Sequence, residues 1–295
     1  MSTRMDRDNS TVSTRQAVVK LAKDPVIDIT PLHGWLDIDF GELWRSRELA
    51  YFFVWRAIKI RYKQTMIGAA WAVLQPITTM LVFSLFFGHL AKLPSGDLPY
   101  PIFYFSALLP WTYFAGAIQN VTNSVVEQQH VVTKVYFPRL LLPIAAAIPG
   151  LLDLAIGLLV FLPMVLFYHL APGKAALVFP IFLLLAVATA LSVGLWLAAL
   201  NTLYRDVRYA VPFLVQIWMF VSPVVYPVSL VPARWRWLYG LNPMAGVIEG
   251  FRWTLTGRGE PPTLLLAVSA GAVLIVLTGG LAFFSRMEGT IADVV

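Results

Sequence analysis

The sequence has no cysteine among its 295 residues. This absence excludes disulfide bonds, zinc sites built on thiolates, and catalysis by a thiol. Charged residues are absent, or almost absent, from six long stretches: 64–91, 98–126, 140–173, 175–204, 209–233 and 261–285. Each stretch is long enough for the roughly 20 apolar residues that a helix needs to cross about 30 Å of hydrocarbon. The sequence therefore predicts an all-α polytopic membrane protein with six transmembrane helices, since isolated strands leave backbone groups unpaired in lipid.

One charged residue breaks this pattern. Of the 22 Lys and Arg and 16 Asp and Glu residues, only Asp153 lies well inside one of the apolar stretches. An ionised group in lipid costs several kcal/mol without a partner, so such a residue is a candidate for function. Asp153 could bond a substrate hydroxyl, pair with a basic group, or be protonated and bonded to a neighbouring helix.

The distribution of basic residues predicts the orientation. Eleven of the 22 Lys and Arg residues precede the first span, and placing the N-terminus in the cytoplasm puts 16 inside and 6 outside. This bias predicts cytoplasmic N- and C-termini in a bacterial inner membrane. Residues 1–41 contain no apolar core of a signal peptide, so we expect the first span to direct insertion.

The remaining segments divide the chain into four parts. We expect a disordered cytoplasmic tail at 1–25, a cytoplasmic apron with an amphipathic interface helix at 26–63, the six-span domain at 64–285, and a cytoplasmic tail at 286–295. Between spans five and six, the aromatic-rich segment 232–260 predicts re-entrant or interfacial helices on the outer side.

Several familiar motifs are missing or weak. There is no G-x-x-x-x-G-K-[ST] phosphate loop, because the Gly173–Lys174 pair follows Tyr168 where the motif requires glycine. No internal repeat occurs, which argues against inverted-repeat carriers. Asp37 and Asp39 match the D-x-D pattern of glycosyltransferases, but so short a pattern also arises by chance. The four histidines are too far apart for a local metal pair, so no metal site is predicted; they are His33, His89, His130 and His169.

Several sequence segments resemble one family when taken together in order. They are RYKQTMIGAAWAVLQP (61–76), VVTKVYFPRLLLP (131–143), NTLYRDVRY (201–209), SPVVYP (222–227) and LNPMAGVIEGFR (241–252). This order and spacing resemble the polysaccharide export permeases, the membrane subunits of type-2 ABC transporters. The likeness is greatest to the Wzm-like O-antigen exporters, with the capsule and teichoic-acid exporters next.

The resemblance implies a homodimer that works with two separate ATP-binding subunits. ATP and magnesium then belong to the partner, and this chain has no cofactor and no catalytic residue. The resemblance also implies a coupling helix that inserts into the ATPase subunit, although an ordinary cytoplasmic connection would look similar. Its residues are Glu127, Gln128, Gln129, His130, Val131, Val132, Thr133 and Lys134.

Basic residues gather just before the first span. Arg56, Lys59, Arg61 and Lys63 could attract the pyrophosphate of a lipid-linked glycan, which arginine binds through paired hydrogen bonds. Anchoring by the positive-inside rule explains the same four residues without a substrate.

Aromatic residues suggest a conduit and a gate. In span five, Tyr209, Phe213, Gln216 and Phe220 recur on one helical face, and Phe83, Phe86 and Phe87 form a patch in span one. Such rings could stack on a sugar polymer, or they could face lipid or pack between helices. Trp235, Trp237, Tyr239 and Trp253 could form an outer gate or an ordinary aromatic belt.

These observations favour a permease that moves a lipid-linked polysaccharide across the inner membrane, driven by ATP hydrolysis in a partner. Three alternatives stay open. A drug or small-lipid exporter would share the fold. An intramembrane enzyme of glycan assembly would use Asp37, Asp39 or Asp153 as catalytic carboxylates. An ion-driven carrier would transport without ATP.

Overall fold

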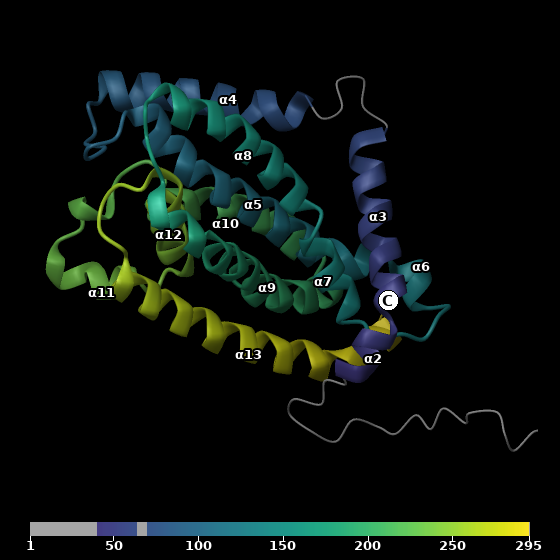
Figure 1. Ribbon diagram of the computed structural model, residues 1–295. Helices are drawn as coiled ribbons and strands as arrows, with labels where there is room; N and C mark the ends of the chain where they lie inside the picture. The colour runs from purple at the N-terminus through teal and green to yellow at the C-terminus, as the bar shows by residue number, and fades with distance from the viewer. Residues whose placement is uncertain (1–39, 64–69, 295) are drawn as a thin grey trace, which may run out of the picture. The chain divides into compact units, whose positions relative to one another are not determined.

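The computed structural model describes residues 40–63 and 70–294, which belong to one compact unit (Figure 1). The predicted tail 1–25, the part of the apron at 26–39, and the start of the first predicted span at 64–69 lie outside the described residues. So do His33, Asp37 and Asp39. The described ranges are helical and contain no strand, which confirms the all-α prediction for this part of the chain.

The α-helices are α2 (Phe40–Arg45), α3 (Arg47–Lys63), α4 (Ala70–Phe83), α5 (Tyr100–Glu127), α6 (Gln129–Val132), α7 (Leu141–Ala147), α8 (Gly150–Phe167), α9 (Phe179–Leu203), α10 (Val207–Val221), α11 (Arg236–Tyr239), α12 (Pro243–Thr256) and α13 (Thr263–Val294). The π-helix η1 (Ser84–Leu90) continues α4, and the 3-10 helices are η2 (Gly173–Val178), η3 (Val228–Leu230) and η4 (Ala233–Trp235).

Five helical segments within the described residues are long and apolar enough to cross a membrane. They are Ala70–Leu90, Tyr100–Glu127, Leu141–Phe167, Gly173–Leu203 and Thr263–Glu288. The third of these is interrupted between α7 and α8, where Pro149 cannot donate a backbone hydrogen bond. The multi-pass character of the protein is thereby confirmed.

The fifth predicted span is shorter than expected. The helix α10 has 15 residues, which corresponds to about 22 Å at 1.5 Å per residue. It ends at Val221, before Ser222 and Pro223, because the residue before proline is pushed out of the helical region. The apolar stretch that follows is instead buried in the protein, with Val224 at 0% exposure. A sixth span therefore remains a prediction.

The helix α5 is the centre of the bundle. It packs against α4, α7, α8, α9, α10 and α12. Its aromatic side chains Tyr104, Phe105 and Phe114 are fully buried. On α9, Gly194 lets the two helices approach, because a Cβ atom there would lie 2.5 Å from Val121. Since lipid is as apolar as these side chains, close packing rather than exclusion from water holds such helices together.

Side-chain contacts show that the helices alternate in direction. Phe105 of α5 stacks on Phe161 of α8, with ring centroids 6.0 Å apart, and Asn201 of α9 bonds the backbone of Thr122. Accordingly α5, α9 and α13 run one way and α4, α8 and α10 the other. The end that carries α6 is called the α6 end below. The opposite end, which carries the start of α5 and the end of α12, is called the α12 end.

Candidate functional site

Asp153 pairs with two side chains of the helix α3. Its Oδ2 lies 2.6 Å from Nη2 of Arg61, and its Oδ1 accepts a hydrogen bond from the hydroxyl of Tyr62. The ion pair is only partly buried, because the two side chains remain 45% and 26% exposed. Burial, and then the hydrogen bond to Asp153, raises the pKa of Tyr62 to about 12. The structure thus balances the acid of α8 with a cation from α3 and ties the two helices together.

A cavity of about 490 Å³ opens beside α3 at the α6 end. Arg56 and Arg61 line it from α3, and polar side chains of α5, including Gln119 and Asn120, form another wall. Arg56 also donates a hydrogen bond of 3.3 Å to Oε1 of Gln128. The cavity therefore presents two guanidinium groups together with amide side chains and the carboxyl group of Glu127. The guanidinium groups suit an anion that carries hydroxyl or amide neighbours.

The other two cations of the predicted head-group cluster lie apart from this cavity. Lys59 and Lys63 are exposed and do not line it. The Nζ atom of Lys59 is 5.7 Å from the centre of the Trp55 ring. The structure thus brings two of the four cations together around a hollow and leaves the other two on the exposed side of α3.

The predicted coupling segment forms the end of α5 and the short helix α6. Val132 is 8% exposed and packs with Phe53 of α3 and Phe137. The exposed side chains of the segment are Glu127, Gln129, His130, Thr133 and Lys134. The segment therefore has an apolar inner side that fixes it to α3 and a polar outer side. The exposed surface continues into Val135 and Tyr136, which are 53% and 68% exposed and which the sequence did not single out.

The predicted face of α10 is exposed along its whole length. Tyr209, Phe213 and Phe220 are 68%, 63% and 53% exposed, and Gln216 is also exposed. The opposite side of the helix buries Val211 and Val215.

The aromatic patch of span one is divided in the structure. Phe83 stacks on Tyr104 with ring centroids 4.7 Å apart, and Phe87 stacks on Phe83 at 5.3 Å. Both rings pack against the core, whereas Phe86 is 54% exposed. Only Phe86 is therefore presented outward.

The four predicted gate residues fall into two environments. Trp235 and Trp237 are about half exposed, at 49% and 54%. Tyr239 is half-buried, and its hydroxyl lies 3.1 Å from that of Tyr226. Burial, and then this hydrogen bond, raises the pKa of Tyr239. Trp253 lies on α12, where it packs beside Phe182 with ring centroids 6.5 Å apart.

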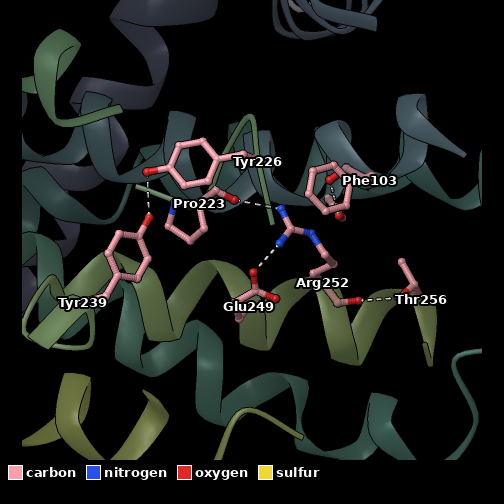
Figure 2. A network of polar contacts seen from close by, with 8 residues as sticks. Phe103, Pro223, Tyr226, Tyr239, Glu249, Arg252 and Thr256 are labelled. Atoms are coloured by element: carbon pink, nitrogen blue, oxygen red, sulfur yellow. Dashed lines mark hydrogen bonds and ion pairs between the residues drawn. The ribbon is translucent and has the colours of Figure 1, made fainter. Parts of the chain in front are cut away.

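Arg252 forms a polar network that the sequence did not reveal. Its side chain is 6% exposed, and Nη1 lies 2.6 Å from Oε1 of Glu249 (Figure 2). Nη2 donates to the carbonyl of Pro223 at 2.8 Å, and the guanidinium carbon lies 3.8 Å from the centre of the Phe103 ring. Sequence reasoning counted Arg252 only as one of the outer cations. The signal that could have identified the pair is a carboxylate three residues earlier on one helix.

The comparison with known proteins gives a consistent result. The family model described as ABC-2 type transporter matches residues 48–256. The O-antigen export system permease protein RfbA of Myxococcus xanthus is 29% identical over 252 residues, which cover 84% of this chain and 95% of that protein. A protein of the same name from Klebsiella pneumoniae is 22% identical over 239 residues, covering 80% and 91%. The polysialic acid transport protein KpsM of Escherichia coli is 23% identical over 239 residues, covering 79% and 91%.

The family match runs from α3 to the end of α12, so it contains nearly all of α3, the predicted coupling segment and the Arg252 network. Together with the five helices that can cross a membrane, it shows that this chain is a multi-pass membrane protein of the ABC-2 type transporter family.

Proposed function

We propose that this chain is the permease subunit of an ATP-driven exporter that moves a lipid-linked polysaccharide of the O-antigen type across the bacterial inner membrane. The observation that carries this proposal is the match to 95% of the length of the Myxococcus xanthus O-antigen permease. A match of that extent includes both ends of the helix bundle, where a substrate enters and leaves.

The exposed face of α10 supports a conduit. Gln216 on α10 and Gln75 on α4 are exposed, and neither amide has a hydrogen-bond partner within residues 40–63 and 70–294. An amide that faces lipid without a partner is costly, so these faces suit water, a sugar chain or a second copy better than hydrocarbon. Tyr209, Phe213 and Phe220 add flat rings for weak, repeated contacts with a moving polymer, and Phe86 adds another.

The conduit requires two copies of the chain. Only Met80 of α4 is buried, and half of the 14 residues of this helix are exposed, which leaves surface for a neighbouring chain or lipid. Pairing of α4 and α10 with the same helices of a second copy would create a closed two-fold interface, as in most homo-oligomers. The exposed amides would then face the space between the copies.

The lipid head group would bind at the α6 end. Arg56 and Arg61 of the cavity beside α3 would grip the pyrophosphate through charge-assisted hydrogen bonds. Lys59 and Lys63 would add to the positive field from the exposed side of α3. Asp153 would hold Arg61 in place until the phosphate arrives.

The energy source lies in a separate subunit that binds ATP and magnesium. The segment 127–134 would dock into that subunit with its exposed side, and Val132 would pass the movement to α3 through Phe53. At the α12 end, Trp235, Trp237, Tyr239 and Trp253 would form the gate through which the polymer leaves. Both termini would lie in the cytoplasm.

Deletion of the gene tests the proposed function. We expect the cells to lose their long surface glycan and to accumulate the lipid-linked polymer on the cytoplasmic side, and we expect the wild-type chain to restore export. Surface glycan of normal length in the deletion strain, with no polymer trapped inside, would show that the proposal is wrong.

A further inference from the structure

A second cavity, of about 250 Å³, lies at the α12 end and shares only Trp253 with the residues discussed above as conduit, gate or head-group site. Its walls come from three separate parts of the chain. They are the loop 95–98 with Phe103 of α5, the segment 227–229 after α10, and residues 249–260 at the end of α12 and beyond.

Two glycines shape the rim of this cavity. Gly96 has φ +63° and Gly259 has φ +82°, a region in which residues with a side chain are strained. The loop at Gly96 is closed by the Ser95 hydroxyl, which donates to the carbonyl of Leu98 at 2.6 Å. The rim is therefore held by tight turns.

The floor of the cavity is the Arg252 network. Figure 2 shows the guanidinium between Glu249 and the carbonyl of Pro223, beside the ring of Phe103. Because Arg252 and Glu249 neutralise each other, this pair adds no net charge to the cavity. It also joins α12 to the loop after α10, which holds two of the three walls together.

The remaining charges stay available to a ligand. Asp97, Arg258 and Glu260 are exposed, line the cavity, and form no ion pair within the part of the chain that the structure describes. Two carboxylates and one guanidinium leave a net negative charge, which repels phosphates and acidic sugars. The same groups accept hydrogen bonds from hydroxyls and donate to them.

Trp253 supplies an apolar wall beside these polar groups. Its ring is half-buried against the core and lines the cavity. A flat ring next to carboxylates and a guanidinium matches a sugar ring, which has an apolar C–H face and a polar rim of hydroxyls. The volume of 250 Å³ is smaller than the roughly 300–1,000 Å³ of pockets for drug-sized ligands, so it suits one or two sugar rings.

We propose that this cavity is a binding subsite for a neutral sugar unit of the exported glycan, which Trp253 stacks upon and which Asp97, Arg258 and Glu260 hydrogen-bond. The inference rests on the proposed function and adds a selectivity to it: the exit side of this permease prefers uncharged sugars. It excludes uronic or sialic acids by the net negative charge of the cavity.

The test is binding of two matched oligosaccharides to the full chain, purified with its ATP-binding partner. The probes are a neutral galactose tetramer and a galacturonic acid tetramer, which differ in charge but hardly in shape. Saturation-transfer NMR titrations should show that the neutral tetramer binds about tenfold or more tightly than the acidic one. Equal or tighter binding of the acidic tetramer would overturn the inference.

Variants of residues that line the cavity test whether the neutral tetramer binds there and not elsewhere on the protein. We expect Trp253→Ala to weaken binding of the neutral tetramer about tenfold, and Trp253→Phe to retain most of it because a flat ring remains. The matched control is Trp44→Ala on α2, an exposed tryptophan that lies outside the cavity and has no part in the conduit, the gate or the head-group site, and it should change nothing. An equal loss in the control and in Trp253→Ala would contradict the assignment.

Removing the carboxylates of the cavity should improve binding of the acidic tetramer relative to the neutral one. The double variant Asp97→Asn with Glu260→Gln should reduce the preference for the neutral tetramer, because it removes both unpaired carboxylates. An unchanged preference would contradict the electrostatic argument. Since these titrations involve no transport, they can fail while the deletion experiment succeeds, and the reverse also holds.

Discussion

At the scale of single residues, the two charged side chains that matter most lie at opposite ends of the bundle and differ in burial. Arg252 is 5% exposed and has its partners on its own helix and on a loop 29 residues away. Arg61 is far more exposed and reaches across to Asp153 on another helix. Burial decides how much stability is lost when an ion pair is removed, because water screens the charges of an exposed pair far more than those of a buried one.

We expect Arg252→Met to destabilise the protein by about 3 kcal/mol or more, because it leaves Glu249 and the carbonyl of Pro223 without their partner. The measurement is the thermal unfolding midpoint of the purified protein in detergent. Arg234→Met removes an exposed arginine whose recorded contact is with the ring of Trp235, so its midpoint should stay near that of the wild type. The double variant Arg252→Met with Glu249→Gln should recover part of the loss. Equal midpoints for Arg252→Met and Arg234→Met would contradict the role of the network.

Tyr62 predicts a dependence of stability on alkaline pH. An unfolded tyrosine has a pKa of about 10, and the fold raises the pKa of Tyr62 to about 12. A raised pKa means that the folded protein holds this proton more tightly, so the contribution of Tyr62 is complete below pH 10 and is lost as the pH rises to 12. Unfolding midpoints of wild type and Tyr62→Phe should converge over this range. A constant difference between them would show that the fold does not raise the pKa of Tyr62.

At the scale of elements, α10 has one side that packs in the core and one side that is exposed. One side holds Val211 and Val215 in the core, and the other exposes rings and an amide. A helix that only anchored the bundle would have no use for an exposed glutamine, whereas a helix that lines a conduit would.

We therefore expect Phe213→Ala and Val215→Ala to act on different properties. Val215 is 6% exposed, so its truncation should cost about 1–2 kcal/mol of stability through a cavity. Phe213→Ala should leave the unfolding midpoint unchanged and lower the amount of exported glycan severalfold. Thermal unfolding and gel analysis of the surface glycan measure the two effects. A loss of stability in Phe213→Ala with normal export would show that this face packs in the fold and does not guide the polymer.

At the scale of the whole molecule, the distribution of exposed apolar surface indicates which helices meet a partner. Both α4 and α10 combine exposed apolar residues with an exposed glutamine, whereas the exposed large side chains of α8 are apolar. Hydrocarbon is a sufficient neighbour for α8 but not for the other two helices.

The absence of cysteine makes this idea directly testable, because each single-cysteine variant carries one thiol per chain. We expect Leu85→Cys on η1 or Leu214→Cys on α10 to form cross-linked dimers with a short bismaleimide in membranes. The controls Leu159→Cys on α8 and Ile275→Cys on α13 are 69% and 75% exposed and should stay monomeric on the gel. Cross-links in the controls alone would place the interface on the other side of the bundle.

The membrane character, the all-helical class and the family follow from the sequence by itself. Freedom from charge over more than 20 consecutive residues is a local property, and so is the order of short segments such as the one at 241–252. The exposed face of α10 could also be derived, because helical periodicity alone places Tyr209 and Phe213 on one side.

Only the tertiary structure decided which apolar residues meet protein and where a buried charge finds its partner. The stretch 209–233 has the composition of a span, but apolar composition is the same for a core and for lipid. In the structure α10 ends before Pro223 and Val224 packs inside the protein. Phe83 turned inward for the same reason. Asp153 meets Tyr62 across 91 residues and Arg252 meets Pro223 across 29. Such contacts depend on how helices cross in space, and no local pattern of residues carries that information.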